Sequence, residues 1–328
     1  MLVFLKWLAG FTAVIAISFI GVCVWGYSVF VQPGPSVSDT TVLIPKGAGT
    51  ESIVRILAER RLISSELVLR VGVVVRGADR SLRAGEFVIP AKVSLEEIIE
   101  IFRSGKTVVR RLTVAEGLTT AEVLIRLAST EGLTGLVTSE PREGRLLPET
   151  YHFSYGDSRE QIVQRMRSAM NRTLDELWVT RKPGLPYRSL NEALVMASIV
   201  ERETGLPAER SRVAGVFVNR LSRGMRLQSD PTVIYALAPV SGSLGRNLTR
   251  KDLAYDHPYN TYVRAGLPPG PIANPGRDSI KAALNPAETD ALYFVANGKG
   301  GHAFSNTLKE HNRNVAAWKK IRKARAKH

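Results

Sequence analysis

Two glutamates, Glu201 and Glu203, follow an almost uninterrupted apolar segment in the stretch ALVMASIVERETG, residues 193–205. Carboxyl groups at the end of a buried helix suit proton transfer, because burial and the negative end of the helix dipole both favour the protonated form. A carboxylic acid that keeps its proton near neutral pH can act as a general acid. Glu201 follows Ala197 and Ser198 by one helical turn, so we expect its pKa to be raised.

A structural role is the competing interpretation for Glu201, because Arg202, Arg210 and Arg212 are basic residues with which it could pair. Glu203 lies two positions later and therefore points to another face of the helix. The periodicity of the apolar residues alone does not choose between the two glutamates as proton carrier.

Other common catalytic and metal-binding patterns are missing from the sequence. The five histidines are scattered, with no His-x-x-x-His pair, so a zinc hydrolase is poorly supported and we predict no metal site. No Gly-x-Ser-x-Gly elbow occurs, and the single cysteine, Cys23, lies in an apolar N-terminal segment. We therefore predict carboxylate chemistry that needs no cofactor.

An uncharged apolar segment at residues 7–31 predicts a single transmembrane helix. At about 1.5 Å per residue, it is longer than the roughly 30 Å hydrocarbon core of a bilayer. Trp7 and Trp25, near its two ends, suit the two membrane interfaces. Lys6 gives the short cytoplasmic end, residues 1–6, its only side-chain charge. We expect this helix to lie in the cytoplasmic (inner) membrane, with the N-terminus on the cytoplasmic side and the catalytic part facing the periplasm or cell wall.

The formal net charge of +15 over 328 residues indicates an acidic partner. For an exported chain we do not expect nucleic acid, and anionic lipid headgroups or anionic wall polymers are the more suitable partners. The basic run at residues 318–328 has electrostatic attraction as its only functional interpretation.

Strand-turn-helix patterns follow a short Pro/Gly/Ser linker at residues 32–39. Capping boxes are expected at the starts of three helices, formed by Ser94 with Glu97, by Thr119 with Glu122 and, further along the chain, by Ser189 with Glu192. Each pattern needs neighbours to bury its apolar face, so the sequence predicts a small α+β module and not isolated hairpins.

The predicted fold class is α+β, with a single N-terminal transmembrane helix. The small module covers residues 40–108, and a mostly helical α+β catalytic part covers residues 109–328. A hairpin around Asn297 and Gly298 is expected near the C-terminal end.

Four stretches resemble, together and in order, the YceG-like family of endolytic murein (peptidoglycan) lytic transglycosylases. They read ASIVERETG, VAGVFVNRLSRGMRLQSDPTVIYAL, PYNTYVRAGLPPGPIANPG and ALYFVANGKGGHAFSNTLKEHN. The resemblance covers nearly the whole exported chain and implies that the small module is LysM-like. It also implies endolytic cleavage of the β-1,4 bond between N-acetylmuramic acid (MurNAc) and N-acetylglucosamine (GlcNAc) in nascent peptidoglycan strands, which limits strand length. Peptidoglycan synthases are the implied neighbours.

The resemblance assigns catalysis to the glutamate of the SIVE segment, Glu201, acting as the single general acid and base. As an acid it protonates the leaving glycosidic oxygen. As a base it takes the proton from the C6 hydroxyl, which attacks the anomeric carbon and forms a 1,6-anhydro-MurNAc end. Glycosidases that use water need a second carboxylate, whereas a tethered hydroxyl removes that need.

Contacts to sugar hydroxyl and acetamido groups are implied for further residues, which are Gln228, Asp230, Asn260, Tyr262, Asn274 and Tyr151. Asp230 has an alternative role as the N-cap of a short helix that begins with Pro231. Glu149 stands where the family usually has an aspartate, which preserves the charge.

Two other functions stay open. A hydrolytic muramidase would need a second carboxylate, for which Asp230 and Glu203 are the candidates. A non-catalytic wall-binding scaffold would use the LysM-like module and the basic surface, and it would tolerate neutralisation of Glu201.

Overall fold

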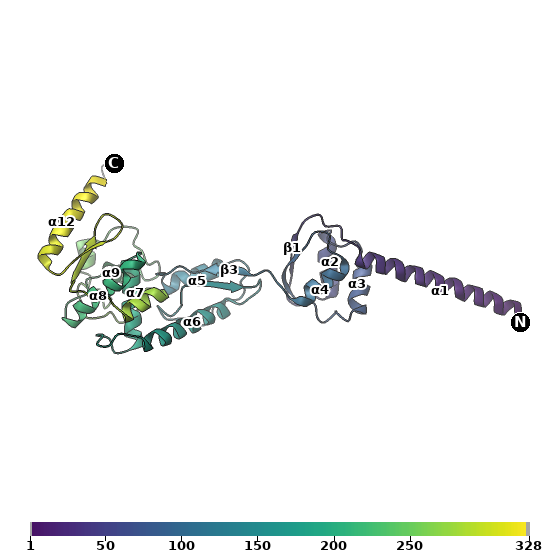
Figure 1. The fold of residues 1–328 in the computed structure, drawn as a ribbon, viewed down its shortest axis with the longest axis horizontal. Helices are drawn as coiled ribbons and strands as arrows, with labels where there is room; N and C mark the ends of the chain where they lie inside the picture. Colours follow the sequence, from purple (N-terminus) through teal and green to yellow (C-terminus); the bar gives the residue numbers. More distant parts are fainter. Residues whose placement is uncertain (1, 326–328) are drawn as a thin grey trace. The chain divides into compact units, whose positions relative to one another are not determined.

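The computed structural model describes residues 2–325. Met1 and residues 326–328, which end the predicted basic run, lie outside the described residues. The chain forms two compact units (Figure 1). The first unit contains the residues up to Arg110 together with His152–Asp157, and the second contains Arg111–Tyr151 and the residues from Ser158 onward.

The N-terminal apolar segment forms one continuous helix, α1 (Leu2–Val31). Its Phe4–Val31 part has a mean hydropathy of 2.2, and none of the window that defines this value is buried. The helix is therefore long and apolar enough to span a membrane. Near its end, Phe30 is only 7% exposed and packs into the core of the first unit.

A small α+β module makes up the rest of the first unit. Its two strands pair antiparallel, with Val42 opposite Phe87, and these strands are β1 (Thr40–Ile44) and β2 (Gly85–Ile89). Three helices bury their apolar faces in the same core, and they are α2 (Thr50–Glu59), α3 (Glu66–Val75) and α4 (Leu95–Ser104). The LysM-like assignment of this module stays a prediction.

Two of the three predicted capping boxes are present, whereas the Glu192 side chain accepts its hydrogen bond from the Arg188 backbone and not from that of Ser189. The Ser94 side chain accepts a hydrogen bond from the Glu97 backbone, and the Glu97 side chain accepts one in return at the start of α4. Thr119 and Glu122 do the same at the start of α5. Gly105 ends α4 with φ of 66°, a left-handed conformation that glycine adopts without strain.

The second unit is mostly helical. Its helices are α5 (Thr120–Ser129), α6 (Arg159–Val179), α7 (Leu190–Glu203), α8 (Arg210–Ser222), α9 (Asp230–Leu237), α10 (Arg250–Leu253), α11 (Arg277–Leu284) and α12 (Leu308–Arg325), with a 3-10 turn at Pro207–Glu209. Strand β3 (Arg110–Thr113) pairs with β4 (Thr150–Phe153). The predicted C-terminal hairpin is formed by β5 (Tyr293–Ala296) and β6 (His302–Ser305), and Figure 1 shows α12 following it. The α+β fold class is confirmed.

Helix α7 is the centre of the second unit. Every residue from 193 to 200 is buried, and the helix packs against α6, α8 and α11. A helix that is buried on all sides cannot rotate about its axis without breaking this core. The side chains of its last turn therefore have fixed directions.

Candidate functional site

The end of α7 carries both candidate glutamates. Glu203 is the last helical residue, because the buried Thr204 leaves the helix with φ of −141° and ψ of 128°. Successive helical residues are about 100° apart around the axis, so Glu201 and Glu203 point to nearly opposite sides.

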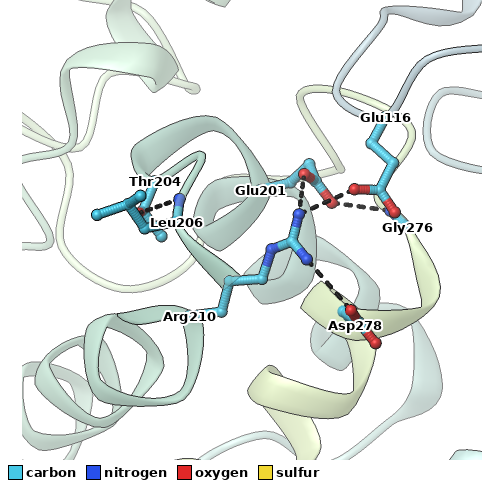
Figure 2. A network of polar contacts seen from close by, with 7 residues as sticks. All are labelled: Glu116, Glu201, Thr204, Leu206, Arg210, Gly276 and Asp278. Atoms are coloured by element: carbon cyan, nitrogen blue, oxygen red, sulfur yellow. Dashed lines mark hydrogen bonds and ion pairs between the residues drawn. The ribbon is translucent and has the colours of Figure 1, made fainter. Parts of the chain in front are cut away.

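Glu201 lies in an ion-pair cluster around Arg210 (Figure 2). Its Oε2 accepts a hydrogen bond from the Gly276 backbone N–H at 2.8 Å, and its Oε1 lies 3.5 Å from Arg210 Nη2. The same guanidinium lies 2.9 Å from Glu116 and 3.3 Å from Asp278. The Glu201 side chain is only 5% exposed, so this carboxylate is a buried charge with its own partners.

The cluster joins four parts of the second unit, which are the end of α7, the start of α8, the start of α11 and the loop before α5. Burial and the neighbouring charge of Glu201 raise the pKa of Glu116, which shows that acidic groups crowd around one arginine. A Cβ on Gly276 would lie 1.7 Å from Glu116 Oε1, so the Glu116 carboxylate in this position leaves no room for a side chain at residue 276. These contacts include the ion pair with Arg210 that the sequence offered as the alternative to catalysis for Glu201.

Glu203 has a different environment. Ser229 Oγ donates a hydrogen bond to its Oε1 at 2.5 Å. Burial raises the pKa of Glu203 to about 7, and the Asp230 charge acts in the same direction, while the Ser229 hydrogen bond and the Arg220 charge oppose the shift. A carboxyl group with this pKa is present in both protonation states near neutral pH, as a group that alternately donates and accepts a proton requires.

A pocket of about 540 Å³ lies beside Glu203. Three of the predicted substrate-binding residues line it, which are Gln228, Asp230 and Tyr262. The Tyr262 hydroxyl donates a hydrogen bond to Asp230 Oδ1 at 2.5 Å, whereas the Gln228 side chain is exposed to the pocket and solvent. Such a volume suits one or two small polar groups, such as sugar rings of a longer strand.

Two basic residues of this pocket were not singled out from the sequence. Arg220 is 8% exposed and donates hydrogen bonds to the carbonyl oxygens of Leu292 at 2.6 Å and Leu227 at 2.7 Å. His311 stacks on Tyr293, and its Nδ1 is buried without a hydrogen-bond partner among the described residues. Burial lowers the pKa of His311, and the Arg220 charge lowers it further, so the imidazole is neutral near pH 7.

Comparison with known proteins identifies the family. The YceG-like family matches residues 42–317, which is most of the chain. The chain belongs to the YceG-like family.

Relatives of this YceG-like chain carry a common name. An endolytic murein transglycosylase of Bacillus subtilis is 34% identical over 89% of each chain. An endolytic murein transglycosylase of Streptococcus pneumoniae is 29% identical over 84% of this chain and 58% of its own length. A crystal structure of a yceG-like protein from Listeria monocytogenes is similar to the fold with a TM-score of 0.52 and 34% identity, covering 85% of this chain and 99% of that one.

The structure of this YceG-like chain places the other predicted site residues away from the pocket. Asn260 and Asn274 have no exposed surface. Asn260 Nδ2 donates hydrogen bonds to the carbonyl oxygens of Leu253 and Tyr255, while Asn274 Oδ1 accepts one from the Leu146 backbone. Their amides are used in holding loops together, so we leave both outside the proposed substrate contacts.

Tyr151 also differs from the expected sugar contact. It is 6% exposed, and its hydroxyl donates a hydrogen bond to the Leu147 carbonyl oxygen at 2.8 Å. It lines a separate groove with Arg165 and Arg172, and not the pocket beside Glu203.

The alternative role of Asp230 as an N-cap is wrong. Ser229 is the N-cap of α9, with no hydrogen bond from its side chain to the helix, and Asp230 is the first helical residue. The Asp230 carboxylate is instead free to bind Tyr262 at the pocket wall.

Residues of the metal-binding type do not cluster in the described part of the chain. Among residues 2–325, no group of three or more His, Cys, Asp or Glu side chains lies close enough together to hold a metal ion.

Proposed function

We propose that this chain is a lytic transglycosylase that cleaves the MurNAc–GlcNAc β-1,4 bond inside peptidoglycan strands, with Glu203 as its single general acid and base. The observation that carries the proposal is the position of Glu203, whose pKa is raised to about 7 and which lines a pocket shared with Gln228, Asp230 and Tyr262. Membership of the YceG-like family, and relatives named endolytic murein transglycosylase, support the substrate.

The proposed assignment moves catalysis from Glu201, which the family motif had suggested, to Glu203. Glu201 is bound to Gly276 and Arg210, so its proton transfer would disrupt an ion-pair cluster. Glu203 has one hydrogen bond to Ser229 and borders open volume, so it can exchange a proton with a substrate.

In the first step, protonated Glu203 donates its proton to the glycosidic oxygen as the bond from this oxygen to C1 of MurNAc breaks. GlcNAc leaves with a new hydroxyl group. In the second step, the Glu203 carboxylate accepts the proton of the MurNAc C6 hydroxyl while O6 bonds to C1. The product is a 1,6-anhydro ring, Glu203 is again protonated, and no water is consumed.

The surrounding residues suit the two halves of this cycle. The Ser229 hydroxyl and the Arg220 charge stabilise the carboxylate that exists between the steps. Gln228, Tyr262 and neutral His311 offer donors and acceptors to sugar hydroxyl and acetamido groups. Asp230 also lines the pocket. Because hydrolysis needs a second carboxylate, Asp230 makes a hydrolytic muramidase the second candidate function.

We further propose that α1 anchors the chain in the cytoplasmic membrane, with the N-terminus inside and the second unit on the wall side. Its length and mean hydropathy of 2.2 support a span. In this location the substrate is nascent peptidoglycan, and peptidoglycan synthases stay the expected neighbours.

The test compares the full chain with Glu203→Gln and Glu201→Gln on purified glycan strands, with products identified by mass spectrometry. We expect anhydro-ended products from the wild type, and a loss of at least about 100-fold in Glu203→Gln, because general acid–base catalysis contributes about 10²–10⁴-fold. Glu201→Gln should retain the wild-type pH profile with reduced stability.

Other outcomes each reject a part of the proposal. If Glu201→Gln removes activity and Glu203→Gln keeps it, Glu201 is the proton carrier. Reducing ends in place of anhydro ends make water the acceptor, and Asp230→Asn then becomes the decisive variant. Intact strands with every protein, including the wild type, favour the non-catalytic wall-binding scaffold.

A further inference from the structure

Helix α3 has an apolar face that the core of its module does not cover. Val68, Leu69 and Val73 are buried. The opposite side carries exposed apolar residues at positions i, i+4, i+7 and i+8, and these residues are Leu67 (66% exposed), Val71 (53%), Val74 (71%) and Val75 (77%). We name this set the α3 outer stripe. Single exposed apolar residues are ordinary, but a contiguous set on one helix marks a contact surface.

The charged residues of α3 do not interrupt this stripe. Arg70 is directed to acidic partners, since its guanidinium lies 2.9 Å from Glu51 and 3.0 Å from Glu66. The stripe is therefore apolar along the full length of the helix, Glu66–Val75.

A groove of about 480 Å³ connects the stripe with α1. From α1 it is lined by Val22, Cys23, Trp25, Gly26, Tyr27 and Phe30, and from α3 by Leu67, Val68, Val71, Gly72, Val75 and Arg76. The two helices are held together at one end, because a Cβ on Gly72 would lie 2.3 Å from the Phe30 ring. The Arg76 guanidinium lies 5.8 Å from the centre of the same ring.

This packing fixes the depth of α3 relative to α1. From Trp7 to Trp25, α1 rises about 27 Å, close to the roughly 30 Å hydrocarbon thickness, so Trp25 marks the interface nearest the module. Val22 and Cys23 lie on the membrane side of Trp25, and α3 residues line the same groove as both. In a bilayer spanned by α1, a helix in this position presents its stripe to lipid.

We propose that the α3 outer stripe lies in the membrane leaflet nearest the module, with lipid acyl chains covering the stripe and filling the groove. The proposal rests on the proposed membrane span of α1. Lipid is the occupant because none of the most apolar window of α1 is buried, and the acyl chains that cover α1 at Val22 and Cys23 reach the stripe without a break. The module would then be a membrane-surface element, held at a fixed depth by two helices.

The test uses the full chain with Cys23 replaced by serine and a single new cysteine carrying an environment-sensitive fluorophore. Labels at Val71→Cys and Val74→Cys report on the stripe, Val24→Cys reports on α1, and Glu59→Cys, on the exposed end of α2, is the aqueous control. Each protein is reconstituted in phosphatidylethanolamine–phosphatidylglycerol vesicles, with and without lipids that carry a nitroxide quencher at the headgroup or along the acyl chain.

We expect the labels at positions 71 and 74 to be quenched by nitroxide lipids and protected from aqueous iodide, as at position 24, while the label at position 59 shows the reverse. Iodide access at positions 71 and 74 equal to that at position 59 overturns the proposal. Protection without lipid quenching, together with self-quenching that rises with protein density, means that a second copy covers the stripe and also overturns it.

The same preparation distinguishes failure of the membrane proposals from failure of the enzymatic proposal. If the protein fails to float with the vesicles and position 24 is not quenched, the span itself is rejected and the α3 proposal is rejected with it. A protein that shows the expected quenching but cleaves no glycan rejects only the enzymatic proposal.

Discussion

Glu201 and Glu203 lie two residues apart in the last turn of α7, and their carboxylates have no partner in common. Glu201 is bound by the Gly276 backbone N–H at 2.8 Å and lies 3.5 Å from Arg210. Glu203 accepts its hydrogen bond from Ser229 Oγ at 2.5 Å and borders the pocket. One turn of helix therefore directs an ion-paired carboxylate to one side and a group with a raised pKa to the other.

Removal of the Ser229 hydroxyl should raise the pKa of Glu203, because its hydrogen bond favours the carboxylate. In Ser229→Ala, the alkaline limb of the kcat/KM profile, which requires protonated Glu203, should shift upward by as much as about one pH unit. The measurement is glycan cleavage across pH 5–10, with Ser222→Ala at the exposed end of α8 as control. An alkaline limb that does not shift would mean that the Ser229 hydrogen bond does not influence the pKa of the catalytic acid.

Neutralising Glu203 should stabilise the fold at alkaline pH. The folded-state pKa of about 7 lies above the ordinary value of 4.5, so the stability associated with this group is complete below about pH 4.5 and is lost as the pH rises through 7. Glu203→Gln should therefore exceed the wild type in free energy of unfolding by about 1–3 kcal/mol at pH 8 and match it near pH 4.5.

This difference is measured by denaturant unfolding of both proteins at the two pH values, with Glu59→Gln on α2 as the matched control. An equal gain for Glu203→Gln at both pH values would mean that packing, and not ionisation, causes it.

Gly276→Ala should disturb the Arg210 cluster, because the new Cβ would lie 1.7 Å from Glu116 Oε1. Overpacking of this kind costs about 1–3 kcal/mol. Glu116→Ala removes the clashing carboxylate, so the double variant should be more stable than the sum of the single effects predicts. Gly205→Ala, where a Cβ meets nothing within 4 Å, is the control. Strict additivity in the unfolding free energies would contradict the close contact.

His311→Ala should weaken catalysis without moving the pH profile. His311 lines the pocket, where its other ring nitrogen, Nε2, can make a hydrogen bond to a bound substrate. Loss of one such bond corresponds to roughly tenfold in kcat/KM. His257→Ala, which lies outside the pocket lining, should leave kcat/KM unchanged. Full activity of His311→Ala would remove this residue from the substrate contacts.

Local signals predicted much of the fold. The uncharged run became α1, the capping boxes at Ser94 and Thr119 were confirmed, and the Asn297–Gly298 turn joins β5 to β6. Each depends on residues close together in sequence, whose preferences act before tertiary contacts form.

The division of roles between the two glutamates needed the structure. Glu201 meets a backbone N–H 75 residues later in the chain, and Glu203 meets a hydroxyl 26 residues later. No periodicity within α7 contains that information. Asn260 and Asn274 show the same limit, because only the packing of distant loops decides whether an amide faces a substrate or a backbone carbonyl.

The wall of the pocket formed by α12 has a consequence for how the protein becomes functional during its synthesis. His311 and Val315 border the cavity, although α12 has no buried residue of its own. A nascent chain that has emerged only as far as α11 already contains Glu203, Ser229 and Asp230, but its cavity is open on one side. The wall of the pocket is therefore complete only after residue 315 has joined the folded unit.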